Sequence, residues 1–140
     1  MTQMEDILKA LDNEENEQFL NKTSQQIHNE KYNIINELSI TKSQTNVLLN
    51  KLNDYMYIDE IPDIKYGSFV RWINLENNDN IKLTNGGVIC DVDICNNGVI
   101  IKCKNFRHQM FTFLLSKSLI FRKLSNQEKV LLSLSDYLNK

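Results

Sequence analysis

The sequence predicts an α+β protein in which a long N-terminal coiled-coil helix is followed by a small antiparallel β-barrel and a short C-terminal helix. Two observations lead to this prediction. Before the lone proline, Pro62, the chain has no glycine and its apolar residues recur at heptad spacing. After Pro62, short alternating segments are separated by turn sequences, including two Asn-Gly pairs. We therefore expect a helical oligomerisation segment over 1–56, a linker over 57–65, and the barrel with its C-terminal helix over 66–140.

The two halves of the chain also differ in charge. Residues 1–64 carry 5 Lys and 12 Asp or Glu, a net −7, whereas residues 65–140 carry 11 Lys or Arg and 6 Asp or Glu, a net +5. This segregation predicts that the second half meets something anionic, although such a charge is also ordinary for a domain surface. No apolar run approaches the ~18 residues that span a bilayer, and the N-terminus lacks the pattern of a signal peptide. We therefore expect an intracellular protein without a membrane partner.

The N-terminal part begins with an apolar stripe over 4–11, which predicts a short helix or a frayed arm. From Leu20 onward, two series of residues, each seven apart, alternate by four and three as in the seam of a coiled coil. Several seam positions are polar, which lowers stability but can fix the oligomer number. A helix folded back on the barrel, or docked on a different protein, would show a similar stripe. The residues predicted to hold a homo-oligomer together are Leu20, Ile27, Ile34, Leu38, Leu48, Leu52 and Tyr55.

The segment 57–65 contains Pro62, which cannot donate to a β-ladder, so it is predicted to be a linker or an edge strand. Further along, Asn85-Gly86 and Asn97-Gly98 have the composition of two-residue type I′ hairpin turns. The predicted strands are 68–75, 80–84, 87–95, 99–104, 109–115 and 119–124.

Closing the two turns sets the register of a three-stranded meander. Thr84 would lie opposite Gly87, and Asn96 opposite Val99, so the apolar residues of all three strands share one face. That face is predicted to hold Ile81, Leu83, Val88, Cys90, Val92, Ile94, Val99, Ile101 and Cys103. The other face is predicted to carry two cross-strand ion pairs, Asp93 with Lys102 and Asp91 with Lys104.

The C-terminal segment begins with Ser125, followed three residues later by Glu128, which matches the capping box. The helix behind it is predicted to place four residues on one face that covers an open side of the sheet: Val130, Leu131, Leu134 and Leu138. Five or six short antiparallel strands with a terminal helix are typical of a small SH3-like, Sm-like or OB-like barrel. The pattern does not separate these three folds.

Cys90, Cys95, Cys103 and His108 could in principle hold zinc. Their C-x4-C-x7-C-x4-H spacing matches no standard zinc site, and the predicted register turns Cys90 and Cys103 inward but Cys95 outward. We therefore predict buried or idle thiols, no metal and no cofactor. Neither His28 nor His108 has a nucleophile or carboxylate at a recognisable spacing, so we predict that the protein is not an enzyme.

Basic and aromatic residues of the second half are the better candidates for a site. Small barrels bind single-stranded nucleic acid by stacking bases on exposed aromatics beside a cationic groove. The candidate nucleic-acid-binding residues are Arg71, Trp72, Lys102, Lys104, Phe106, Arg107, His108, Arg122 and Lys123. Trp72 and Phe106 could instead belong to the core, and the same loops could contact a protein.

The segments YGSFVRWINL, IKLTNGG, IIKCKN and IFRKLSNQEKVLLSLSDYLNK lie within residues 66–140. In overall pattern they resemble uncharacterised small proteins of large DNA viruses of algae and other protists. The resemblance implies a viral origin, and hence a location in the host cytoplasm or nucleus, or in the virion. It implies no activity and no site residues.

These patterns together predict a non-enzymatic oligomeric adaptor. The helix would set the copy number, and the barrels would present several identical weak sites to a protein partner. The first alternative is an accessory factor that binds single-stranded DNA or RNA with the basic face of the barrel, and the second is a structural virion component. Binding that weakens steeply with added salt would favour the first alternative.

Overall fold

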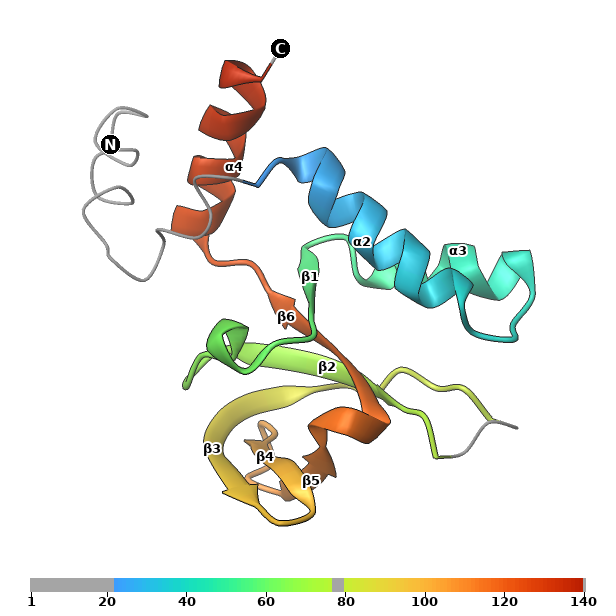
Figure 1. Cartoon of the computed structure of the whole chain (residues 1–140), viewed down its shortest axis with the longest axis vertical. Coiled ribbons are helices and arrows are strands. Elements are labelled where there is room, and N and C mark those ends of the chain that lie inside the picture. The colour runs from blue at the N-terminus through green and yellow to red at the C-terminus, as the bar shows by residue number, and fades with distance from the viewer. Residues whose placement is uncertain (1–21, 77–79, 140) are drawn as a thin grey trace. The chain divides into compact units, whose positions relative to one another are not determined.

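The computed structural model describes residues 22–76 and 80–139, so the predicted short helix over 4–11 and the seam residue Leu20 lie outside it. These residues form two compact units. One unit holds the described residues up to Leu38 together with those from Leu124 onward, and the second unit is Ser39–Lys123. The described α-helices are α2 (Ser24–Asn36), α3 (Lys42–Lys51) and α4 (Asn126–Leu138), and Figure 1 labels them.

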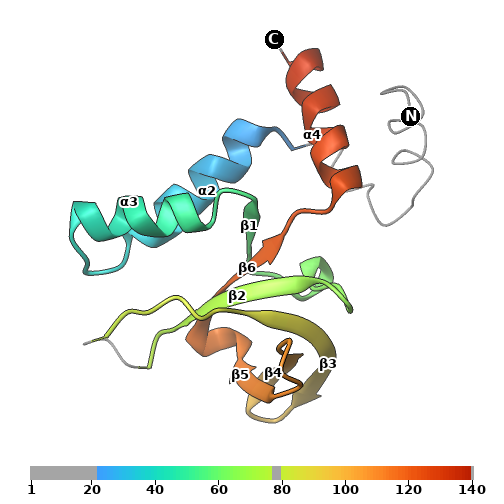
Figure 2. The same cartoon turned by 180° about the vertical axis from the view of Figure 1, so that it is seen from behind.

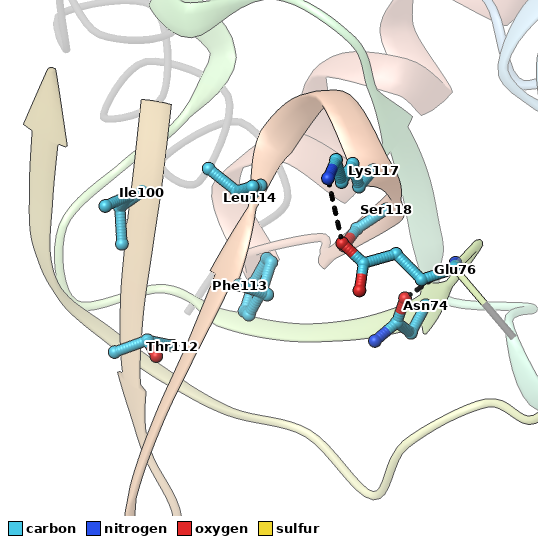
Figure 3. Close-up of a pocket in the computed structure, with 8 residues that line it drawn as sticks. All are labelled: Asn74, Glu76, Ile100, Thr112, Phe113, Leu114, Lys117 and Ser118. Carbon is cyan, nitrogen blue, oxygen red and sulfur yellow. Dashed lines mark hydrogen bonds and ion pairs between the residues drawn. The ribbon is translucent and has the colours of Figure 1, made fainter. Parts of the chain in front are cut away.

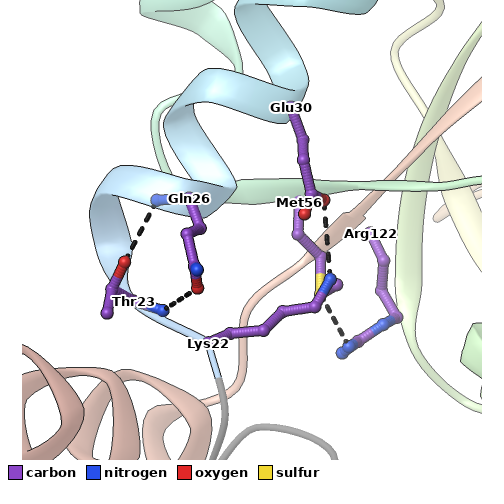
Figure 4. Close-up of polar contacts among 6 residues, drawn as sticks. All are labelled: Lys22, Thr23, Gln26, Glu30, Met56 and Arg122. Atoms are coloured by element: carbon purple, nitrogen blue, oxygen red, sulfur yellow. Dashed lines mark hydrogen bonds and ion pairs between the residues drawn. The ribbon is translucent and has the colours of Figure 1, made fainter.

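The predicted long coiled-coil helix is wrong, because the chain forms two short helices in its place. Each helix begins with a capping box. A threonine side chain accepts a hydrogen bond from the backbone N–H three residues later, and the side chain of the glutamine at that later position accepts one from the threonine backbone N–H. Thr23 pairs in this way with Gln26, as Figure 4 shows, and Thr41 with Gln44. A capping box stabilises a helix start. Thr41 therefore begins a new helix at a position that the heptad pattern treats as part of a continuous seam.

The predicted oligomerisation residues consequently do not share one helix. Ile27 and Ile34 lie on α2, and Leu48 lies on α3, but Leu38 follows the end of α2. Leu52 is the fully buried C-cap of α3, and Tyr55 begins a β-strand. The seam that was expected to bind a second copy is thus divided among two helices, a cap and a strand.

The unit built on α2 and α4 is joined by Ser24, whose backbone N–H and side-chain hydroxyl both donate to the Asp136 carboxylate, at 2.8 and 2.6 Å. The predicted capping box of α4 is confirmed, with Ser125 and Glu128 exchanging bonds. Its predicted apolar face is partly wrong, because Leu131 is buried whereas Leu138 is 71% exposed. Among the helices of the described residues, none combines the length and apolarity needed to cross a bilayer.

The second unit carries a six-stranded antiparallel sheet with the order β1-β6-β2-β3-β4-β5. Two 3₁₀ turns, η2 (Ile61–Asp63) and η3 (Leu115–Lys117), interrupt the connections. The range predicted as a linker, 57–65, therefore holds the end of β1 and η2, and Pro62 lies in that turn. The strands are β1 (Tyr55–Ile58), β2 (Phe69–Asn74), β3 (Gly87–Cys95), β4 (Gly98–Lys104), β5 (Met110–Leu114) and β6 (Ser118–Lys123).

The predicted β-barrel is wrong, because this sheet is curled but not closed. Strands β1 and β5 remain its two edges. The rings of Trp72 on β2 and Phe113 on β5 stack at 4.3 Å, although a flat sheet would hold these strands about 14 Å apart. The sheet therefore bends over its own inner face, and Figures 1 and 2 show the curvature in β3. That face encloses the core: Val70, Trp72, Ile89, Ile101, Cys103, Phe113 and Ile120.

The predicted meander is wrong in register in its second hairpin, and its first hairpin does not form. Strands β3 and β4 do form a hairpin, but Cys95 pairs with Gly98, so the register is shifted by two residues from the expected pairing of Asn96 with Val99. The range 80–84 is no strand of this hairpin, because Leu83 makes an isolated bridge to Ile73 on β2. The strand preceding β3 in the sheet is therefore β2 itself.

A β-bulge between Ile89 and Asp91 reverses the predicted alternation over residues 88–90, whereas Val92 beyond the bulge packs against the core as predicted. Ile89 is buried opposite Cys103, whereas Cys90 is exposed, contrary to the expected inward position of Cys90. An extra residue in one strand shifts every later side chain to the other face. The predicted pair Asp93–Lys102 is confirmed at 3.0 Å, but Asp91 also lies 3.7 Å from Lys102 and does not pair with Lys104.

Candidate nucleic-acid interface

The loop that joins β4 to β5 is held rigid by one side chain, that of Asn105. Its Oδ1 accepts from the backbone N–H groups of Arg107 and Gln109, both at 2.9 Å, and its Nδ2 donates to Gln109 Oε1 at 2.9 Å. The backbone N–H of His108 also donates to the carbonyl of Asn105, with His108 at φ 63°. Asparagine bonds of this type fix tight turns, so the loop presents its other side chains in a defined direction.

Phe106 projects from this loop and is 87% exposed. Its ring stacks on that of Phe69 at 5.9 Å with 19° between the planes. Phe69 in turn lies over Gly86, where an added Cβ would come within 2.8 Å of the ring and 2.5 Å of the Val70 carbonyl oxygen. A glycine backbone thus supports one aromatic ring, which supports a second ring that faces solvent.

The sheet beneath the loop contributes a row of side chains on its outer face. Phe69 pairs with Val88, Val88 with Lys104, and Lys104 with Met110, so the row crosses four strands. Lys104 is exposed, and Met110 is 53% exposed. We call the row and the loop residues above it the loop-end surface, which consists of Phe69, Val88, Lys104, Phe106, Arg107, His108 and Met110.

The segment that supplies most of the loop-end surface contains basic residues but no acidic residue to neutralise them. Residues 98–124 contain six Lys or Arg and no Asp or Glu. Lys102, also on β4, bonds to Asp93, and this hydrogen bond raises the pKa of its ammonium group. Lys104 is exposed two residues away, and no carboxylate pairs with it among the described residues. Exposed Lys104 and Arg107 are therefore the cations that remain available for a ligand.

Four of the predicted nucleic-acid-binding residues meet on the loop-end surface: Lys104, Phe106, Arg107 and His108. Trp72 and Arg122 do not reach the surface, because they are only 6% and 3% exposed. Trp72 belongs to the core, and the Nη2 of Arg122 donates to Met56 Sδ at 3.0 Å, as Figure 4 shows. Arg71 is half-buried, with its Nε donating to the Thr84 carbonyl at 2.8 Å.

Two further residues that the sequence singled out, Lys123 and Tyr55, lie outside the loop-end surface. Lys123 is exposed at the end of β6 and pairs in the sheet with Tyr55. Burial raises the pKa of the Tyr55 hydroxyl, an effect that nearby Arg71 partly offsets. Sequence reasoning missed Phe69, Val88 and Met110, because their common row depends on a register that the Asn-Gly turns alone did not give.

The cysteine and histidine residues that were considered for zinc are separated by the fold. Cys90 and Cys95 are exposed, whereas Cys103 is buried and its burial raises the pKa of its thiol to about 12. His108 lies in the loop beyond β4. Over residues 22–76 and 80–139, no cluster of three His, Cys, Asp or Glu side chains is placed to hold a metal ion.

A pocket of about 250 Å³ lies at the opposite end of β4 and β5. Figure 3 shows Glu76 and Lys117 at this pocket, where they form an ion pair at 3.3 Å and so neutralise each other. The residues that line the pocket are Asn74, Glu76, Ile100, Thr112, Phe113, Leu114, Lys117 and Ser118.

No protein-family model matches the chain, and no curated protein and no solved structure matches it either.

Proposed function

We propose that this protein binds single-stranded nucleic acid through the loop-end surface. The observation that carries the proposal is Phe106, an aromatic ring 87% exposed on a hydrogen-bonded loop between two available cations. An exposed aromatic ring offers a π-face on which a base can stack. Here its stacking partner, Phe69, fixes the orientation of the ring.

The Phe106 ring would take an unpaired base. Phe69 covers part of one side of the ring and leaves most of its surface in solvent, so a base can stack there. Base–aromatic stacking contributes ~1–3 kcal/mol per base and accepts any base, because every base has a π-face. A duplex buries its bases against one another, so this contact favours single strands.

Lys104 and Arg107 would contact phosphates on either side of that base. Both are exposed, and the backbone N–H of Arg107 is fixed by Asn105. Each phosphate that a cation neutralises releases condensed counterions, so affinity falls as salt is added. The proposal therefore requires both stacking and a measurable salt dependence.

The test measures, by fluorescence anisotropy, how the protein binds labelled oligothymidylate and oligouridylate of about eight nucleotides. A labelled duplex of equal length is measured in the same way. We expect single strands to bind better than the duplex, with an affinity that falls steadily between about 50 and 200 mM salt. Phe106→Ala should weaken binding by at least about 5-fold, from the loss of ~1–3 kcal/mol of stacking.

The matched control is Tyr137→Ala, because Tyr137 is an aromatic residue on α4 with a similar exposure of 70%. This variant should bind like the wild type. Absence of binding at low salt, or equal affinities of the Phe106→Ala and wild-type proteins, would refute the proposal.

A second candidate function is the docking of a protein on the same end of the sheet. The edge strand β5 exposes Met110 (53%) and Phe111 (41%), and aromatic residues, methionine and arginine are enriched in protein interfaces. Protein docking predicts that Met110→Ala and Phe106→Ala weaken partner binding to a similar degree. Nucleic-acid binding predicts a response mainly to Phe106→Ala.

A further inference from the structure

The row beneath the loop continues beyond the loop-end surface. Strand β6 follows β2 in the sheet, with Arg122 paired to Val70 and Lys123 paired to Tyr55 on β1. Lys123 is therefore the residue next to Phe69 in the same row, on the outer face, and it is exposed. Read across the strands, the row places a cation on β6, an aromatic ring on β2 and a second cation on β4.

We infer that a bound single strand runs across the strands of the sheet from Lys104 to Lys123, with Phe106 and Phe69 between them, so that Lys123 is a second phosphate anchor. This inference rests on the proposed function and adds the path and the length of the ligand. It predicts which oligonucleotides are long enough to use the whole site.

The sheet topology supports a path along this row. Strands β2 and β3 pair at Phe69–Val88 and Val70–Gly87, both at the loop end, so this is where the sheet offers a continuous surface from β6 to β4. The path ends at β6, because the next residue in the row, Tyr55, is buried.

The spacing sets a minimum length for the ligand. Lys104 and Lys123 lie on strands three spacings apart, about 14 Å along the sheet. Successive phosphates of a stacked strand rise ~3.4 Å, so a stacked strand needs several internucleotide steps to reach both lysines. A trinucleotide without terminal phosphates has two phosphates one step apart and can reach only one of them.

The first experiment is titration of the isotopically labelled protein with oligothymidylates while backbone amide signals are recorded by NMR. A strand of about eight nucleotides should shift the signals of the β4–β5 loop and those around Lys123. The trinucleotide should shift the loop signals alone. If the longer strand shifts the loop signals but leaves those around Lys123 unchanged, the path is wrong while the proposed function stands. If it shifts neither at low salt, the proposed function itself fails.

The second experiment compares Lys123→Ala with Lys42→Ala, a control that removes an exposed lysine from α3. For the longer strand, Lys123→Ala should weaken binding several-fold and reduce the slope of log affinity against log salt by about 0.7, the value for one phosphate contact to a single strand. Lys42→Ala should leave both unchanged. Equal effects of the two substitutions would show a general charge effect and overturn the assignment of Lys123.

Discussion

The two ends of the β4–β5 pair carry similar residue types but differ in what their charges can do. At the loop end, Lys104 and Arg107 are exposed beside Phe106, in a stretch of chain without carboxylates. At the opposite end, Lys117 is bonded to Glu76 at the rim of a pocket. A lysine close to a carboxylate contributes little to the attraction of a distant phosphate, because the two fields cancel.

The comparison shows why counting basic residues does not locate a binding surface. Lys102 and Lys104 share one strand and one face, yet Asp93 and Asp91 engage Lys102 and leave Lys104 available. The register set at the turn, where Cys95 pairs with Gly98, places Asp91 opposite Lys102, whereas Lys104 pairs with Val88. Local register therefore decides which lysine can bind a ligand.

The largest expected effect concerns two glycines, one at each end. Gly86→Ala should destabilise the protein by about 3 kcal/mol, since a left-handed backbone at φ 93° costs ~1–3 kcal/mol and the added Cβ would collide with Phe69 and the Val70 carbonyl. Gly98→Ala at the other end should cost about 1 kcal/mol, because its φ is 121° but no atom lies within 4 Å of the new Cβ. Urea denaturation measures both values.

The difference between the two glycines is the informative quantity. Equal losses of stability would mean that backbone strain alone accounts for the effect of both substitutions. They would contradict the packing of the Phe69 ring on Gly86. A greater loss of stability at Gly86 would show that the Phe69 ring packs directly on the Gly86 backbone.

The next effect concerns two asparagines. Asn105→Ala removes three hydrogen bonds that hold the β4–β5 loop, and we expect hydrogen exchange of the Arg107 and Gln109 amides to accelerate and affinity for single strands to fall by about 3- to 10-fold. Asn74→Ala removes one bond, to the Glu76 N–H at the opposite end, and should leave affinity unchanged. Unaltered exchange in the Asn105 variant would contradict a preorganised loop.

The sequence predicted several parts of this fold because their signals are local. The capping box of Ser125 and Glu128 depends on four consecutive residues, and the pair Asp93–Lys102 survives a shift of register because the two side chains remain on one face. Phe106 and Arg107 were predicted as site residues from composition alone. Their exposure follows from a turn that Asn105 builds within five residues.

The remaining errors arise where the deciding interaction is distant or where two local signals compete. Thr41 fits a heptad position and also a capping box, and the box determines the structure. The bulge at Cys90 and the pairing of Leu83 with β2 depend on contacts between strands, which alternation along one strand cannot reveal. Trp72 was ambiguous for the same reason, since its burial depends on Phe113 from the far edge of the sheet.

The smallest expected effect separates neighbouring lysines. Lys104→Ala should reduce the slope of log affinity against log salt by about 0.7, the contribution of one phosphate contact to a single strand. Lys102→Ala lowers the net charge by the same amount, and it also leaves Asp91 and Asp93 without their partner. If nucleic acid responded only to net charge, Lys102→Ala would weaken binding at least as much at low salt. Contact with Lys104 instead predicts that its loss changes the slope, whereas loss of Lys102 leaves the slope as it is, and salt titrations of the two variants distinguish these outcomes.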